Sequence, residues 1–104
     1  MAQFDVHRNS NPASRRSIPY LVDVQSDLLE SLSTRVVIPL LRQTSSVEAV
    51  SRLNPAFEID GVACVLSTAE LAGVLHSNIG AKVGSLKQQR AAIINALDFL
   101  ITGI

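Results

Sequence analysis

The sequence predicts a small, mainly β fold that is closed by one C-terminal α-helix. Short runs rich in aromatic and β-branched residues, each bounded by turn residues, recur along most of the chain. Near the C-terminus, Leu86, Ile93, Leu97 and Leu100 recur at helical spacing. About six mostly antiparallel strands and one helix are typical of a small barrel, or of a sheet with a helix packed beside it.

Length and composition limit the classes of protein that fit. A chain of 104 residues suits a single domain over 1–104. Its hydrophobic fraction is 47%, but no apolar run approaches the ~18–20 residues of a membrane helix. The N-terminus lacks the pattern of a signal peptide, so we expect a cytoplasmic protein without a membrane partner. Nine basic and nine acidic residues give zero net charge, which argues against a protein that binds mainly to phosphates.

The first strands frame a loop and a turn. The run "QFDVH" alternates and predicts the first strand, and "YLVDVQS" predicts the second. The loop between them holds Arg8, Arg15 and Arg16, a positive cluster that is either a solvated loop or a dock for an acidic partner segment. After the second strand, "DLLESLS" predicts a turn or short helix that carries Leu28 and Leu29.

The middle of the chain continues the β pattern. "TRVVIPLL" predicts a third strand, in which Pro39 implies an edge position or a bulge. The polar connection "RQTSSVEAVSRLNP" has room for a short helical turn. In "FEIDGVACVL", Asp60-Gly61 predicts a type I′ hairpin. Ser67 and Glu70 form a capping-box pattern for a brief helix, and "AGVLHSNIG" predicts one more short strand.

The final helix has signals at both ends. Ser85 and Gln88 form a second capping-box pattern at its start. Gly103 is placed to end the helix in a left-handed conformation.

The residues offer little chemistry. Cys64 is the single cysteine and lies in the apolar run "VACVL", which predicts a small buried hydrophobe. His7 and His76 lie on different predicted strands without a nucleophile nearby, so both are expected to be ordinary strand histidines. The acidic residues show no metal-binding or general-acid spacing. We therefore expect a binding protein without a metal or cofactor, not an enzyme.

Three stretches go further than composition: "YLVDVQSDLLE", "TRVVIPL" and "AIINALDFLITGI". Together they resemble the CcdB family, the toxin half of the CcdA/CcdB toxin–antitoxin modules. Their order and spacing fit along the whole chain. The resemblance implies an SH3-like small antiparallel barrel, of the kind that CcdB and MazF toxins share, in a homodimer. It also implies a non-enzymatic toxin that binds the A subunit of DNA gyrase and traps the gyrase–DNA cleavage complex. A CcdA-like antitoxin would neutralise the toxin, and the pair would repress its operator, with DNA contacted only through the antitoxin.

The resemblance also carries over contact residues. It places the gyrase contacts at the end of the helix and on the turn after the second strand, at Leu28, Leu29, Asp98, Ile101, Thr102, Gly103 and Ile104. The best-known plasmid member has a tryptophan in place of Thr102 and an amide in place of Asp98. The antitoxin is expected over the first loop, at Arg8, Arg15 and Arg16.

Two alternatives remain open at this point. One is an endoribonuclease toxin of the MazF type, which shares the barrel but needs groups that stabilise a phosphorane and a basic RNA groove. The other is a non-toxic homologue that binds only the antitoxin. Thr102 motivates the second alternative, because a large aromatic side chain is the kind that anchors an interface.

Overall fold

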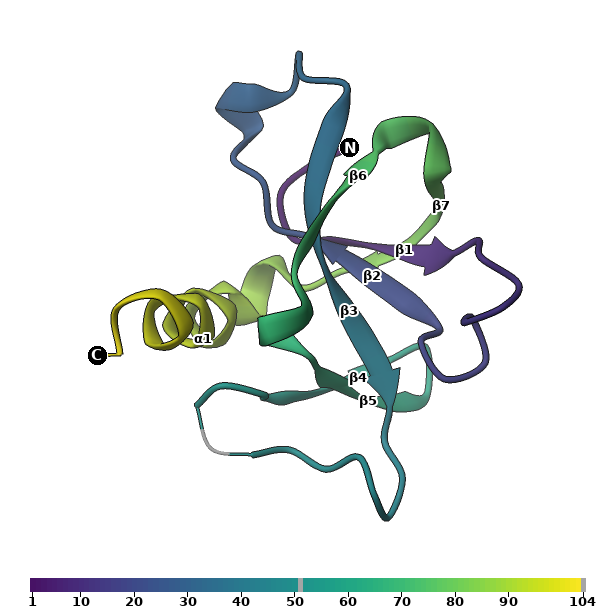
Figure 1. Ribbon diagram of the computed structural model, residues 1–104, viewed down its shortest axis with the longest axis vertical. Helices are drawn as coiled ribbons and strands as arrows, with labels where there is room; N and C mark the ends of the chain where they lie inside the picture. The colour runs from purple at the N-terminus through teal and green to yellow at the C-terminus, as the bar shows by residue number, and fades with distance from the viewer. Residues whose placement is uncertain (51, 104) are drawn as a thin grey trace.

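The structure, a computed structural model, is an antiparallel sheet with one helix at its side (Figure 1). It describes residues 1–50 and 52–103. The strands are β1 (Asp5–Asn9), β2 (Tyr20–Asp23), β3 (Thr34–Arg42), β4 (Ala56–Ile59), β5 (Val62–Leu66), β6 (Ala72–Leu75) and β7 (Ile79–Ser85). Within the described residues, three short 3-10 turns lie between strands, η1 (Asp27–Leu29), η2 (Thr68–Glu70) and η3 (His76–Asn78), and a fourth, η4 (Lys87–Gln89), follows β7. The helix α1 follows at Arg90–Thr102.

The long strand β3 organises the sheet. The strand order is β4-β5-β3-β2-β1-β7, all neighbours are antiparallel, and β6 also pairs with β3. One side of β3 pairs with β2. On the other side, 34–37 pair with β6 and 40–42 pair with β5. Because its two halves have different partners, the sheet can curl, and Figure 1 shows β6 and β7 arching over β1, β2 and β3.

The edge position or bulge implied by Pro39 is wrong, since β3 lies inside the sheet and its register with β2 is continuous. The Pro39 carbonyl accepts a hydrogen bond from the Ser67 N–H at 3.0 Å, on the side away from β2. In an antiparallel strand, the nitrogen of a residue faces the same side as its carbonyl. The Pro39 nitrogen therefore faces the side of β3 where β6 has ended and β5 has not yet begun to pair. No hydrogen bond between strands is lost there because proline lacks an N–H group.

Two expectations about local elements also need correction. The stretch "AGVLHSNIG" is not one strand: β6 ends at Leu75, His76 begins η3 rather than lying on a strand, and β7 adds a seventh strand. Within the connection at 42–55, the described residues form neither a 3-10 helix nor an α-helix. The Thr44 hydroxyl there accepts hydrogen bonds from the N–H groups of Ser46 and Val47, which satisfies them without a helix.

Several local signals are confirmed. Asp60 and Gly61 both have positive φ angles, +49° and +80°, and join β4 to β5 as a type I′ hairpin requires. The brief helix after Ser67 is η2, but the capping box does not form: the Ser67 hydroxyl donates to Glu70 Oε1 at 2.6 Å and caps no backbone N–H group. Gly103 ends α1 at φ +74°, with its N–H donating to the Phe99 carbonyl.

The hydrophobic core lies on one face of the sheet. Val6, Val22 and Ile38 occupy neighbouring positions on β1, β2 and β3 and are completely buried. From α1, Ile93 and Ala96 are also completely buried, and Leu97 packs against the same cluster. The helix contacts η2 and η4, so its position is fixed by the elements around β5 and β7.

Gly80 marks a close approach between β7 and β1, because a Cβ atom there would lie 2.6 Å from the Arg8 carbonyl oxygen. We expect Gly80→Ala to lower the free energy of unfolding by about 1–3 kcal/mol, since the clash is with rigid backbone. Gly84→Ala is the matched control on the same strand, because no atom lies within 4 Å of its added Cβ. Urea unfolding followed by far-UV circular dichroism measures both; an equal effect of the two substitutions would contradict the close approach.

Candidate functional site

A buried ion pair supports the turn that carries Leu28 and Leu29. Arg35 Nη2 lies 2.6 Å from Asp23 Oδ2, and Arg35 Nε donates to the same oxygen at 2.9 Å. The exposed fractions of the two side chains are 1% and 0%. Charges removed from water this completely are tolerated only with close pairing and additional hydrogen bonds. Asp23 has such a bond, because its Oδ1 accepts from the Gln25 N–H at 3.0 Å.

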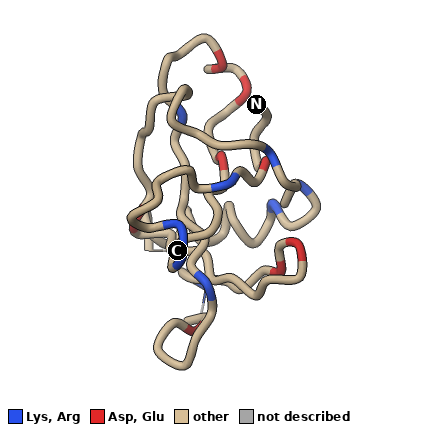
Figure 2. Tube along the Cα trace, turned by 90° about the vertical axis from the view of Figure 1, so that its right-hand side faces the viewer, with Lys and Arg blue, Asp and Glu red and all other residues tan. Residues whose placement is uncertain are grey.

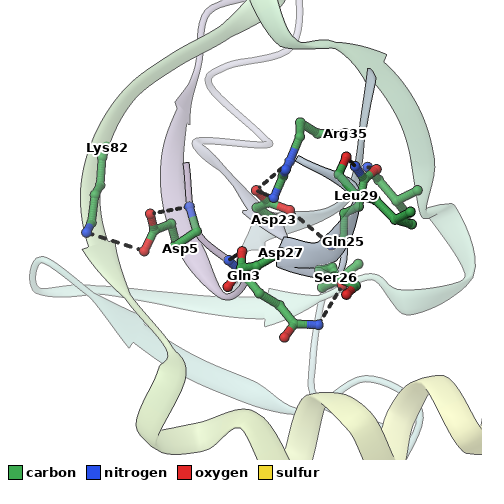
Figure 3. A network of polar contacts seen from close by, with 12 residues as sticks. Gln3, Asp5, Asp23, Gln25, Ser26, Asp27, Leu29, Arg35 and Lys82 are labelled. Carbon is green, nitrogen blue, oxygen red and sulfur yellow. Dashed lines mark hydrogen bonds and ion pairs between the residues drawn. The ribbon is translucent and has the colours of Figure 1, made fainter. Parts of the chain in front are cut away.

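Gln25 connects this ion pair to η1. Its side-chain Oε1 accepts a hydrogen bond from the Val36 N–H at 3.1 Å, and its Nε2 donates to the Leu29 carbonyl at 3.0 Å. Figure 3 shows Asp23, Gln25 and Arg35 close together, beside Leu29. One buried amide therefore holds the turn to β3.

Further hydrogen bonds hold η1 from its other side. The Ser26 hydroxyl accepts from the Leu28 N–H at 3.2 Å, and Asp27 Oδ1 accepts from the Gln3 N–H at 2.8 Å. Despite this support, the exposed fractions of Leu28 and Leu29 are 93% and 48%. The turn therefore presents two leucines to solvent on a backbone that is fixed by side chains.

The helix α1 presents a second apolar surface. Ile94 and Ile101, two turns apart on one side of the helix, have exposed fractions of 41% and 73%, and Asp98 lies between them. The Thr102 hydroxyl donates to the Asp98 carbonyl at 2.7 Å. Thr102 and Gly103 are exposed, whereas Ile104 lies outside the described residues. Arg52 covers another side of the helix, with its guanidinium 5.2 Å from the centre of the Phe99 ring.

The two apolar surfaces do not lie side by side within one chain. Figure 1 shows η1 and the C-terminal end of α1 at separate corners of the molecule. Gln3 lies between the two elements: besides its bond to Asp27, it lines a pocket of about 420 Å³ together with Ile94 and Asn95 of α1. Gln3 is not among the residues that the sequence predicts, and nothing in its local pattern distinguishes it.

The predicted arginine cluster is only partly gathered. Arg8 and Arg15 line a pocket of about 560 Å³, and Arg42 from the end of β3 lines it with them. Arg16 does not line this pocket, although its carbonyl accepts a hydrogen bond from Arg42 Nε at 3.3 Å. We call this site the arginine pocket. Arg42 lies far from Arg8 in the sequence, so only the sheet brings the two together.

The remaining titratable candidates are structural. Cys64 is completely buried, as predicted, and this burial raises the pKa of its thiol, partly offset by the nearby positive charge of Arg42. His7 is buried on β1, and its Nδ1 lies 3.1 Å from the Gly80 carbonyl oxygen. Among residues 1–50 and 52–103, no group of three or more His, Cys, Asp or Glu side chains could hold a metal ion. No helix in that part of the chain is long and apolar enough to cross a membrane.

The curled antiparallel sheet with one helix is consistent with an SH3-like barrel, and its exposed leucines, helix face and arginine pocket are features of a protein that docks onto partners. A family model described as "CcdB protein" matches residues 3–103, nearly the whole chain. The chain therefore belongs to the CcdB family, which confirms the resemblance seen in its sequence. Membership supports a toxin of the CcdB type from a toxin–antitoxin module.

Proposed function

We propose that the chain is the toxin of a type II toxin–antitoxin module, and that it binds the A subunit of DNA gyrase and traps the gyrase–DNA cleavage complex. One observation carries the proposal: Leu28 is 93% exposed on a turn that a buried ion pair and a buried amide hold in place. Burying a leucine side chain gains about 1.5–3 kcal/mol, and a fixed turn loses little conformational freedom on binding. The turn therefore has the physical properties of a docking element.

The helix supplies the second contact surface, with Ile101 and Ile94 as its apolar positions. In a homodimer each apolar surface occurs twice, related by the two-fold axis. A symmetric toxin therefore offers equivalent surfaces to a partner that is itself two-fold symmetric. In this proposal the chain acts as one domain over 1–104, by binding and not by catalysis, and uses no metal or cofactor.

A CcdA-like antitoxin is the second proposed partner, with Arg8, Arg15 and Arg16 as its contacts. Operator DNA is contacted through the antitoxin. The charge distribution supports this division, because Figure 2 shows basic and acidic positions interleaved along the trace rather than a continuous basic stripe. A DNA backbone lying across such a surface would meet acidic side chains as well as basic ones.

A DNA-cleavage assay with gyrase from the source organism tests the proposal. We expect the purified chain to increase the amount of DNA that is covalently held by gyrase, with supercoiling lost as its concentration rises. The same assay without gyrase controls for contaminating nucleases. Normal supercoiling and no trapped complex at high concentration would overturn the gyrase proposal. If the chain still bound its antitoxin under those conditions, it would be a non-toxic member of the family.

A further inference from the structure

The arginine pocket is formed by the sheet and not by one segment of the chain. Arg8 on β1 lies opposite Tyr20 on β2, and Tyr20 lies opposite Leu40 on β3. Arg42 follows two residues after Leu40, so Arg8, Tyr20 and Arg42 belong to the same face of the sheet. All three of these residues line the pocket.

The loop that supplies Arg15 is held in place from both sides of the pocket. From β1, the Asn9 side-chain Nδ2 donates to the Ser14 hydroxyl at 3.0 Å and to the Ile18 carbonyl at 2.9 Å. From β3, the Arg42 N–H donates to the Ser17 carbonyl at 2.9 Å. Hydrogen bonds within the chain therefore hold the backbone of the loop that carries Arg15 against β1 and β3.

The pocket has positive charge without a negative partner. Among the described residues, neither Asp nor Glu lines it, and Arg8 and Arg15 form no ion pair. Tyr20 as a whole residue is 5% exposed, and its hydroxyl makes no hydrogen bond within the described residues. Three guanidinium groups and one hydroxyl can all donate to oxygen anions, and guanidinium matches the two oxygens of a carboxylate.

We infer that the arginine pocket binds carboxylate side chains of an acidic peptide segment. Its volume of about 560 Å³ is far larger than one small anion and fits several side chains. A nucleic acid is disfavoured, because the positive charge is local and the net charge of the chain is zero. Within the pocket, carboxylate recognition therefore centres on Arg8, Arg15 and Arg42, whereas Arg16, the third proposed antitoxin contact, does not line the pocket. Identifying the segment as part of the antitoxin rests on the proposed function. The binding of carboxylates by the pocket does not depend on that function.

The test measures binding of a fluorescent hexaglutamate peptide to the full chain at low salt by anisotropy. We expect Arg42→Gln and Arg15→Gln each to weaken binding about tenfold, since each removes one charge-assisted contact. Arg42→Lys keeps the positive charge but cannot bind a carboxylate in the bidentate geometry of a guanidinium. Its loss of peptide affinity should therefore be smaller than that of Arg42→Gln. Arg90→Gln, on α1 and outside the pocket, is the matched control and should change the dissociation constant less than about twofold. Far-UV circular dichroism verifies that each variant is folded.

Three outcomes would overturn the inference: no peptide binding by the unchanged chain, equal weakening by Arg90→Gln, or preferential binding of a short duplex DNA that Arg42→Gln abolishes. Competition by inorganic phosphate at a concentration equal to that of the peptide would also contradict it, because a single small anion would then suffice. The assay contains no gyrase. A failure to trap gyrase therefore leaves this result intact, and a failure here leaves the gyrase proposal untouched.

Discussion

Replacing Arg35 with methionine is expected to lower the free energy of unfolding by about 3–5 kcal/mol, because it leaves a buried carboxylate without its partner. Asp23 has no exposed surface, and its Oδ2 lies 2.6 Å from Nη2 and 2.9 Å from Nε of the Arg35 guanidinium. Typical domains are stable by about 5–15 kcal/mol, so the variant would lose a large share of its stability. Urea unfolding followed by far-UV circular dichroism measures the loss.

Lys82→Met is the control for the loss of a basic side chain from an ion pair. Lys82 Nζ lies 3.3 Å from Asp5 Oδ1, but the lysine side chain is 56% exposed. Ion pairs in contact with water contribute about 0–1 kcal/mol, so this substitution should have little effect. The double substitution Asp23→Leu/Arg35→Met removes both buried charges and should recover part of the stability. If Arg35→Met and Lys82→Met cost the same, the burial of the ion pair would have no energetic consequence.

The sequence predicts those parts of the fold that depend on local conformation. Asp60-Gly61 and Gly103 were identifiable because only a few residue types readily adopt positive φ angles. The strand β7 could not be identified in this way. It contains Gly80 and Gly84, which weaken a strand pattern, and Gly80 is required by an approach to Arg8 that is far away in the sequence. The position of Pro39 likewise depends on which strands pair with β3 on either side of it.

The candidate site likewise has parts that the sequence could predict and parts that it could not. The family resemblance, and not the hydrophobic pattern, singled out Leu28 and Ile101, and the structure shows that both are exposed. The support beneath Leu28 was not predictable, because Asp23 and Arg35 come from two strands whose register decides whether their side chains meet. Arg16 and Arg42 differ in the same way: closeness in sequence groups Arg16 with Arg8 and Arg15, whereas the sheet brings Arg42 to the pocket.

Under the proposed function, introducing a charge at either apolar surface is expected to weaken gyrase poisoning strongly. We expect Leu28→Asp and Ile101→Asp each to raise the concentration needed for half-maximal trapping by about 30-fold or more, as for the central residues of other interfaces. A carboxylate at such a position would lose water on binding and gain no partner. The DNA-cleavage assay measures this concentration, and the exposed fractions of 93% and 73% indicate that folding should be preserved.

Val50→Asp is the matched control, because Val50 is 60% exposed and lies in the connection between β3 and β4, outside both surfaces. The same charge at position 50 should leave trapping unchanged. If Val50→Asp were as damaging as the other two, the effect would come from net charge and not from a docking surface. Loss of trapping in Ile101→Asp alone would restrict the interface to α1. The buried network beneath η1 would then stabilise the fold without presenting Leu28 to a partner.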